Sequence, residues 1–233
     1  MQNRIVSKDE WLVARKELLA KEKTFTRARD ALSAERRALP WVRVDEDYVF
    51  DTADGRRTLA ELFDGRSQLV VYHFMFAPEW EAGCKSCSFW ADNFDRSVVH
   101  LAHRGITLIA VSRAPLATLQ AYAKRMGWSF PWVSSGGSRF NHDFGVSFTS
   151  EQIASGTIDY NYQRTEAHVG ELPGVSVFYR DAGGAVLHTY STYARGLDMF
   201  NTAYHYMDIV PLGRDEGDGI MAWLRRRDEY DAP

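Results

Sequence analysis

Charged and apolar residues alternate at helical spacing through the first part of the chain. Ser7 stands three residues before Glu10 in the form of a capping box, and the spacing of the apolar residues that follow predicts a helix over residues 8–22. A second charged segment, 26–39, predicts another surface helix that ends before a proline. We therefore expect residues 1–40 to form an N-terminal helical arm that packs on the rest of the chain or, as the alternative, joins two copies in a homodimer.

The pattern changes to short apolar runs after this arm. Residues 68–76 and 106–112 are nearly continuous apolar runs, which are typical of strands covered on both faces of a sheet. An apolar stripe at helical spacing predicts a helix over 85–103, and a proline and a glycine delimit a second helix over 115–127. A short strand over 130–134 follows. These segments predict alternating strands and helices joined by right-handed crossovers.

Two β-hairpins are expected to flank this series. Residues 48–52 lead into an Asp-Gly pair, which is a strong turn signal. Towards the other end of the chain, residues 174–180 and 185–190 surround a glycine-containing turn, and a helix over 197–207 follows.

Turn-forming residues divide the rest of the chain. Residues 134–156 are rich in Gly, Ser, Asn and Asp, and they are expected to form an irregular insertion. Loops of this length often carry function. We expect one α/β domain over residues 41–215 and a C-terminal tail over 216–233.

Composition narrows the classes of partner. The 233 residues include 28 basic and 31 acidic side chains, so no excess of positive charge favours a nucleic acid or an anionic membrane. The chain begins without the apolar run of a signal peptide, and no later segment is long and apolar enough for a membrane span. We expect a soluble, cytoplasmic protein.

The two cysteines, Cys84 and Cys87, are the candidate reactive centre. Cys84 falls where the predicted helix begins, and there the unpaired N–H groups and the neighbouring cation of Lys85 favour a thiolate. Cys87 lies one turn further in, at the head of the apolar stripe. The spacing therefore predicts a redox pair in which Cys84 attacks a disulfide and Cys87 resolves the mixed disulfide. A zinc site would need further ligands from scattered histidines, so we expect no metal, and no cofactor is indicated.

The order of strand, Cys-x-x-Cys helix, strand, helix and final β-hairpin is the arrangement of thioredoxin-like proteins. It predicts an α/β three-layer sandwich around a central mixed β-sheet. Pro173 precedes the first strand of the last hairpin, where thioredoxin-like proteins place a cis-proline that faces the cysteines. Pro173, Trp80 and Lys85 are the residues expected to contact a substrate.

Other polar residues are interpreted as structural. His73 lies in an apolar strand, where a neutral, hydrogen-bonded histidine is expected, and His142 in the insertion is the better functional candidate. Tyr190, Tyr193 and Arg195 follow the last hairpin, where structural hydrogen bonds are the preferred interpretation and an anionic substrate the alternative.

The chain resembles a bacterial family, the domain of unknown function 899, whose members are described as predicted dithiol-disulfide oxidoreductases. The resemblance extends from Ser7 to Glu216, and it implies a thioredoxin-like fold. Lys85-Ser86 replaces the Gly-Pro pair of thioredoxins, which leaves the redox potential open. The resemblance rests on Glu10-Trp11, Leu39-Pro40-Trp41, Leu62-Phe63-Asp64-Gly65-Arg66-Ser67-Gln68-Leu69, Tyr72-His73-Phe74-Met75-Phe76, Cys84-Lys85-Ser86-Cys87-Ser88-Phe89, Gly127-Trp128-Ser129-Phe130-Pro131-Trp132-Val133-Ser134 and His188-Thr189-Tyr190-Ser191-Thr192-Tyr193-Ala194-Arg195-Gly196.

Three functions remain open at this point. The first is a thiol-disulfide oxidoreductase that acts on a disulfide-containing protein or a small thiol, with an electron donor that the sequence does not identify. The second is a peroxiredoxin-like thiol peroxidase, although Glu81 stands where those enzymes carry a Thr or Ser, three residues before Cys84. The third is a redox-silent binding module that uses the loop 77–83 and the insertion 134–156.

Overall fold

The computed structural model describes residues 3–230. The contacts within the chain divide it into two compact units, a short one that ends at Pro40 and a larger one that begins at Trp41. Each unit is described by itself.

The short unit contains one long helix, α1 (Lys8–Arg37). The predicted capping box is confirmed, because Ser7 accepts a hydrogen bond from the Glu10 N–H and the Glu10 carboxylate accepts one from the Ser7 N–H. The prediction of two helices is wrong. The hydroxyls of Thr24 and Thr26 donate to carbonyls one turn earlier, so the β-branched residues at the expected break remain inside the helix.

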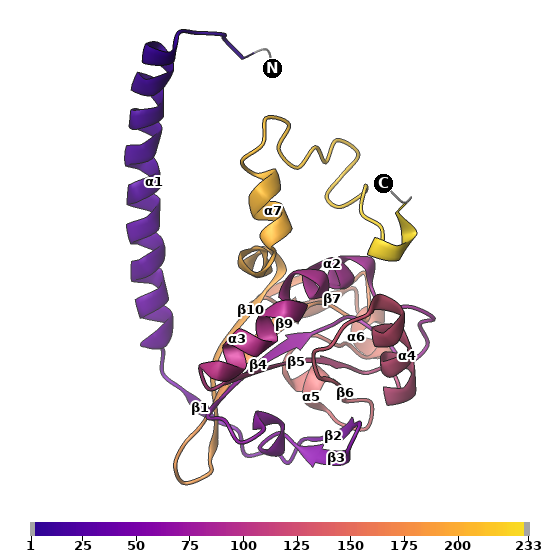
Figure 1. Cartoon of the computed structure of the whole chain (residues 1–233). Coiled ribbons are helices and arrows are strands. Elements are labelled where there is room, and N and C mark those ends of the chain that lie inside the picture. The colour runs from indigo at the N-terminus through magenta and orange to yellow at the C-terminus, as the bar shows by residue number, and fades with distance from the viewer. Residues whose placement is uncertain (1–2, 231–233) are drawn as a thin grey trace. The chain divides into compact units, whose positions relative to one another are not determined.

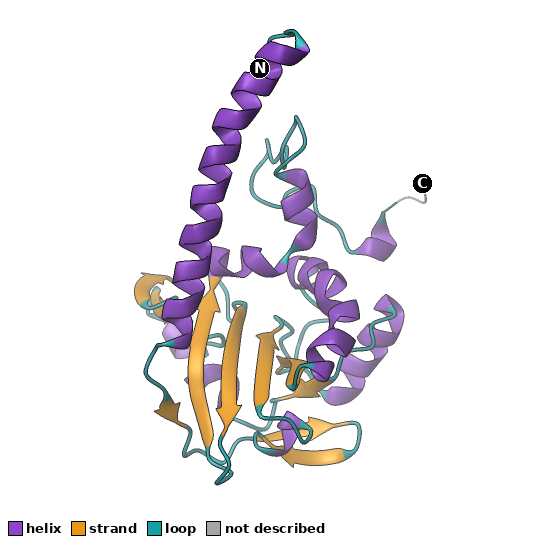
Figure 2. Ribbon diagram, turned by 60° about the vertical axis from the view of Figure 1, so that its left-hand side comes forward, coloured by secondary structure: helices purple, strands orange, loops and turns teal. Residues whose placement is uncertain are grey.

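The larger unit is built on an eight-stranded sheet with the order β1-β10-β9-β4-β5-β6-β2-β3 (Figures 1 and 2). β4 pairs in parallel with β5, and β5 with β6, whereas β9 is antiparallel to both β4 and β10. This order and these directions confirm the thioredoxin-like α/β fold. The strands are β1 (Val42–Arg43), β2 (Val49–Thr52), β3 (Gly55–Thr58), β4 (Gln68–His73), β5 (Ile106–Ser112), β6 (Trp132–Ser134), β9 (Gly174–Arg180) and β10 (Val186–Tyr193).

The core consists of two hydrophobic clusters, which lie on opposite faces of the sheet. The first joins α2 (Lys85–Phe94) and α4 (Leu116–Met126) to Tyr72 and Phe74. The second joins Leu69 and Val71 of β4 to α5 (Phe140–Asp143), among other elements. Because neighbouring residues of a strand point to opposite faces, β4 contributes side chains to both clusters. The sheet is thus the middle layer of the predicted three-layer sandwich.

The helix predicted over 85–103 is interrupted. α2 and α3 (Val98–His103) lie end to end in Figure 1, with a turn of 3-10 helix, η2 (Asp95–Ser97), between them. Asp95 is almost fully buried, and its carboxylate accepts hydrogen bonds from the N–H groups of Ser129 and Phe130 at 2.7 and 3.2 Å. This long-range partner explains why the break falls where the sequence shows a continuous stripe.

The helix predicted over 197–207 is also divided. A 3-10 segment, η3 (Ala194–Phe200), comes first, and α7 (Thr202–Met207) begins after Asn201, whose side chain accepts from the N–H of Tyr204. The side-chain cap therefore sets the start of α7 five residues later than predicted.

The insertion 134–156 contains two short helices, α5 and α6 (Ser150–Ala154). A further hairpin that the sequence analysis missed follows it, made of β7 (Thr157–Tyr160) and β8 (Gln163–Glu166). Its two turn residues, Asn161 and Tyr162, both have positive φ, at 54° and 62°. A tyrosine seldom adopts this conformation. The pair is not the Asn-Gly that usually marks such a turn, so the sequence carries no strong turn signal here.

Within residues 3–230, none of the helices has the length and apolar character that crossing a bilayer requires.

Candidate dithiol site

The loop between β4 and α2 brings Cys84 against the end of the sheet. The N–H of Cys84 donates to the Met75 carbonyl at 3.1 Å, and Cys84 is the N-cap residue of α2. Gly83 packs closely here, since a Cβ atom on this residue would lie 2.7 Å from the Phe74 ring and 3.0 Å from the Tyr122 ring. A residue without a side chain is therefore what allows α2 to begin so near β4.

The surroundings of Cys84 favour the thiolate. The Cys87 thiol donates a hydrogen bond to Cys84, and this bond, helped by the N–H groups of Cys87 and Ser86, lowers the pKa of Cys84 to about 6 against the opposing effect of burial. Lys85, in contrast, directs its ammonium group to the Met221 carbonyl at 3.5 Å. The charge on Cys84 is thus stabilised by the start of the helix and by the second cysteine.

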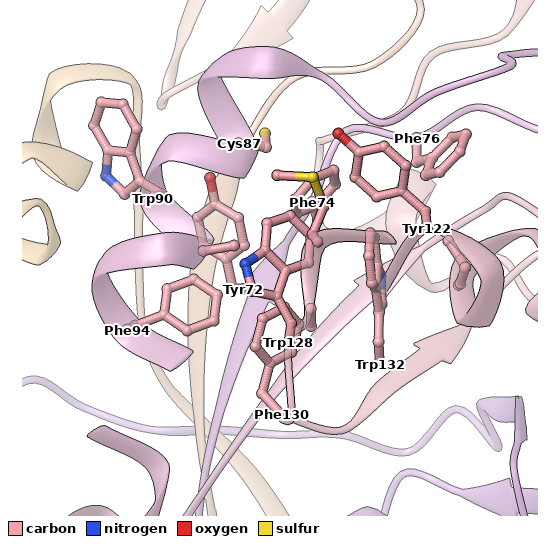
Figure 3. Packing of buried hydrophobic residues seen from close by; sticks show 14 of the residues in the cluster. Tyr72, Phe74, Phe76, Cys87, Trp90, Phe94, Tyr122, Trp128, Phe130 and Trp132 are labelled. Atoms are coloured by element: carbon pink, nitrogen blue, oxygen red, sulfur yellow. The ribbon is translucent and has the colours of Figure 1, made fainter. Parts of the chain in front are cut away.

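Cys87 has the opposite character. Its side chain is 1% exposed, and burial raises its pKa well above the ordinary thiol value. Its sulfur accepts a hydrogen bond from the Met75 N–H at 3.4 Å and another from the Tyr72 hydroxyl. Figure 3 shows the Cys87 sulfur and the Tyr72 hydroxyl at the same edge of the aromatic cluster. Both cysteines are free thiols, so the pair consists of a stabilised thiolate and a protected thiol.

Both cysteines lie in the lining of a cavity of about 330 Å³. Its lining comes from α2, from the loop before β9, from η3 and from the C-terminal segment that follows α7 (residues 208–230). Pro173 lies in this lining together with Cys84 and Cys87, whereas Trp80 and Lys85, both in the described part of the chain, lie outside it. Trp80 packs instead against the edge of the first hydrophobic cluster. Among the apolar lining residues are Met75, Trp90, Leu197, Ile220 and Met221.

Tyr160 forms hydrogen bonds with two parts of the cavity lining, Pro173 and Ala194. Its hydroxyl donates to the Pro173 carbonyl at 2.7 Å and accepts from the Ala194 N–H at 2.9 Å. Ala194 has a positive φ of 48°, a conformation that non-glycine residues seldom adopt without support. Pro173 itself follows a trans peptide bond, as do all residues described between 3 and 230. Tyr160 belongs to the missed hairpin, and for that reason the sequence analysis did not find it.

The C-terminal segment also contacts residues on either side of the cysteines. Arg226 donates two hydrogen bonds to the Gly83 carbonyl, at 2.8 and 3.1 Å, on the residue next to Cys84. Trp223 packs edge-on against Phe89 of α2. Residues from this segment thus form part of the site, a contribution that the sequence analysis did not foresee.

The histidine that was preferred as a functional candidate is used internally. His142 Nδ1 lies 2.9 Å from the Ser147 carbonyl, to which it donates, and Nε2 lies 3.0 Å from an Arg113 guanidinium nitrogen. Arg113 also pairs with the buried Glu171 at 2.8 Å. His142 therefore joins the insertion to the end of β5, and it is not among the residues lining the dithiol cavity.

Tyr193, the last residue of β10, and Arg195 in η3 both make contacts within the protein. The Tyr193 hydroxyl donates to the Phe144 carbonyl at 3.0 Å, which is a structural bond. Arg195 lines the cavity but is paired with Asp198 at 2.9 Å.

Comparison with known proteins identifies the family. The model of the family described as "Bacterial protein of unknown function (DUF899)" matches residues 1–230. The chain belongs to this family. Among curated proteins, none matches the sequence.

Solved structures with a similar backbone include a peroxiredoxin and a peroxidoxin. A mutant of peroxiredoxin Q from Xanthomonas campestris is 15% identical, with a TM-score of 0.48 over 72% of this chain and 98% of that one. Peroxidoxin BcpB from Mycobacterium tuberculosis is 14% identical, with a TM-score of 0.46 over 70% of this chain and 94% of that one.

Proposed function

We propose that the protein is a thiol-disulfide oxidoreductase in which Cys84 attacks a substrate disulfide and Cys87 resolves the intermediate. The observation that carries the proposal is the inequality of two hydrogen-bonded sulfurs in one cavity. The pKa of Cys84 is lowered to about 6, whereas burial raises the pKa of Cys87. A thiolate is the attacking form in disulfide exchange, and a buried second thiol next to it has a short path to the mixed disulfide.

The proposed reaction proceeds in two exchanges. The Cys84 thiolate attacks one sulfur of a disulfide R–S–S–R, forms the Cys84–S–R bond and releases R–S⁻, which takes up a proton. Cys87 then loses its proton, and its thiolate attacks the Cys84 sulfur, forms the Cys84–Cys87 bond and releases the second R–S⁻. Two electrons pass from the protein dithiol to the substrate, so an external dithiol must reduce the protein before the next cycle.

Tyr72 and Met75 support the second exchange. The Tyr72 hydroxyl and the Met75 N–H both donate to the Cys87 sulfur, so the negative charge that forms there during resolution already faces two donors. Buried sulfur without such donors would resist deprotonation.

Trapping of the intermediate tests this function. Cys87→Ser, reduced and then mixed with a small disulfide, should retain one half of that disulfide on Cys84, and the adduct should appear as a mass increase that dithiothreitol removes. Cys84→Ser is the matched control and should give no adduct. In the unmodified protein, mild oxidation should instead remove two hydrogens reversibly. Adduct formation on Cys87 in the Cys84→Ser variant, or the absence of adducts from both, would contradict the proposal.

A thiol peroxidase is the second candidate, since a partly exposed thiolate of pKa about 6 also reacts with peroxides. The side chain three residues before Cys84 is the exposed carboxylate of Glu81, which offers no hydroxyl to hold a peroxide. Consumption of hydrogen peroxide should therefore be slower than reduction of a small disulfide at equal concentration. The reverse order of rates would favour the peroxidase.

A further inference from the structure

The charged residues in the wall of the dithiol cavity are already paired with each other. Arg214 forms two hydrogen bonds with Asp208, at 2.7 and 2.8 Å, and a third with Asp198 at 3.3 Å. Its guanidinium carbon lies 3.8 Å from the centre of the Tyr204 ring. Asp198 also accepts from Arg195. Each of these charged groups in the wall therefore already has an oppositely charged partner within the protein.

Glu216 is engaged in the same way. One of its carboxylate oxygens accepts from the Tyr204 hydroxyl at 3.0 Å, the Met221 N–H at 3.0 Å and the Trp223 indole N–H at 3.4 Å. A carboxylate oxygen with three donors fixes the fold of the C-terminal segment. This oxygen is therefore already engaged within the protein.

Apart from Ser86 and the two tyrosines, Tyr72 and Tyr204, the remaining side chains of the wall beside the cysteines are mainly apolar. Met75, Trp90, Leu197, Ile220 and Met221 line the cavity beside the two cysteines. Its volume of about 330 Å³ is at the lower end of the roughly 300–1,000 Å³ that small-molecule pockets occupy. A compact apolar molecule fits such a space, whereas a charged group would lose its hydration without gaining a partner.

The C-terminal segment restricts the size of the ligand further. Lys85 donates to the Met221 carbonyl, and Arg226 donates to the Gly83 carbonyl, so the segment is attached on both sides of Cys84. An extended polypeptide laid across Cys84 would have to break these bonds. A small molecule that enters the cavity would not.

We infer that the substrate is a small, uncharged disulfide with apolar substituents, bound in this cavity between α2, η3 and residues 220–221. The inference rests on the proposed dithiol function and adds the chemical class of the substrate. Cys84 forms the mixed disulfide with one apolar half, the other half leaves as a thiolate and is protonated, and Cys87 then releases the first half.

Two disulfides of similar length test the class. Dipropyl disulfide is neutral, and dithiodipropionate carries two carboxylates. Reduced protein is mixed with each at neutral pH, the oxidised protein is quantified by mass, and each rate is divided by the rate of the same disulfide with free dithiothreitol. The neutral disulfide should be favoured about tenfold or more after this correction, because a carboxylate entering the cavity loses hydration that no wall residue replaces. Glutathione disulfide, which is larger and charged, should react more slowly than either.

Two isoleucines of the C-terminal region provide a matched pair of variants. Ile220 lines the cavity and is 75% exposed, whereas Ile209 is 80% exposed and lies outside the lining. Ile220→Lys should raise the rate with dithiodipropionate relative to dipropyl disulfide by several-fold, because it adds one cation to the cavity. Ile209→Lys should leave this ratio unchanged.

The outcomes separate the inference from the function on which it rests. Equal corrected rates, or a preference for the dianion, would overturn the apolar substrate class while the dithiol reaction stands. An equal change of ratio in both lysine variants would also overturn it, since it would indicate attraction by surface charge rather than by the cavity. Failure of every disulfide to oxidise the protein would remove the proposed function and this inference together.

Discussion

The two faces of the central sheet each carry a line of hydrogen-bonded groups that starts from neighbouring residues of β4. On one face, Tyr72 donates to Cys87, which donates to Cys84. On the other, His73 contacts Ser176, which contacts Ser191, and each of these two hydrogen bonds measures 2.8 Å. His188 continues the second line from Ser191, again at 2.8 Å.

The difference lies in the group at the end of each line. The second line ends at His188, where burial lowers the pKa and so disfavours the charged form. His73 is 1% exposed and stacks on Phe140 and Phe144, and burial lowers its pKa to about 3. This fits the neutral core histidine that the sequence analysis expected. The first line ends instead at Cys84, which is partly exposed, stands at a helix start and faces a cavity. A line of hydrogen-bonded titratable groups is thus not sufficient to make a reactive site. The line must end at a group that is both accessible and stabilised in its charged form.

The largest expected effect is on the rate of disulfide exchange, which should depend on Cys84 on one face of the sheet and not on His73 on the other. Cys84→Ser should reduce disulfide exchange to the uncatalysed rate, because a serine hydroxyl does not form a stable anion near neutral pH. His73→Leu should leave the exchange rate unchanged. Both rates are measured with the same small disulfide and dithiothreitol as reductant. Loss of activity in His73→Leu with an unchanged melting temperature would show that the faces are coupled.

The pH dependence of alkylation sharpens the comparison. The folded pKa of Cys84 is about 6 and lies below the ordinary thiol value of about 8.5, so its thiolate fraction, and with it the rate with iodoacetamide, should rise about tenfold per pH unit below pH 6 and level off above it. Cys87→Ala removes the donor that stabilises this thiolate most and should move the midpoint upward. A midpoint near 8.5 in the unmodified protein would contradict the proposed stabilisation.

Local patterns are enough to predict the elements that carry the dithiol. The apolar runs of β4 and β5 and the Pro and Gly that delimit α4 are short-range signals, and they appear at nearly the predicted bounds. The position of Cys84 at the start of α2 follows from the same kind of signal, because the helix predicted from Lys85 begins at that residue, directly after Cys84.

Contacts between distant segments explain what the sequence analysis missed. Arg226 meets Gly83 across 143 residues, and Tyr160 meets Ala194 across 34, so neither contact leaves a local pattern. The break between α2 and α3 depends on Asp95 meeting Ser129, which is likewise outside any local window. Sequence periodicity therefore predicts which residues share one face of a helix, but not which distant loops pack around the site at its start.

A smaller effect is expected on the stability of the second face. His73→Leu keeps the apolar volume but leaves the Ser176 hydroxyl without this partner, which should lower the free energy of unfolding by about 1–3 kcal/mol. Urea unfolding measures the change. His73→Leu combined with Ser176→Ala should lose less than the sum of the two single variants, because the His73–Ser176 bond contributes to both single losses but is lost only once in the double variant. Simple addition of the two losses would argue against an energetically coupled pair.

The smallest effect concerns the walls of the cavity. Tyr160→Phe removes the bonds to Pro173 and Ala194, each worth about 0.5–1.5 kcal/mol, and should slow disulfide exchange a few-fold. Tyr162→Phe is the matched control in the same hairpin, since its hydroxyl donates to the Ser191 carbonyl and contacts neither wall. Equal slowing in both variants would mean that the hairpin acts through stability alone.

Gly83 gives the site an unusual sensitivity to a very small change. Gly83→Ala would add a methyl carbon 2.7 Å from the nearest atom of the Phe74 ring. The centre of that ring lies 4.5 Å from the centre of the Trp132 ring. Because closely packed rings give way little, we expect the backbone of residue 83 to shift, and with it the bond from Cys84 to Met75 and the carbonyl that receives Arg226. The mutational tolerance of the dithiol is therefore limited as much by a position that carries no side chain as by the two sulfurs themselves.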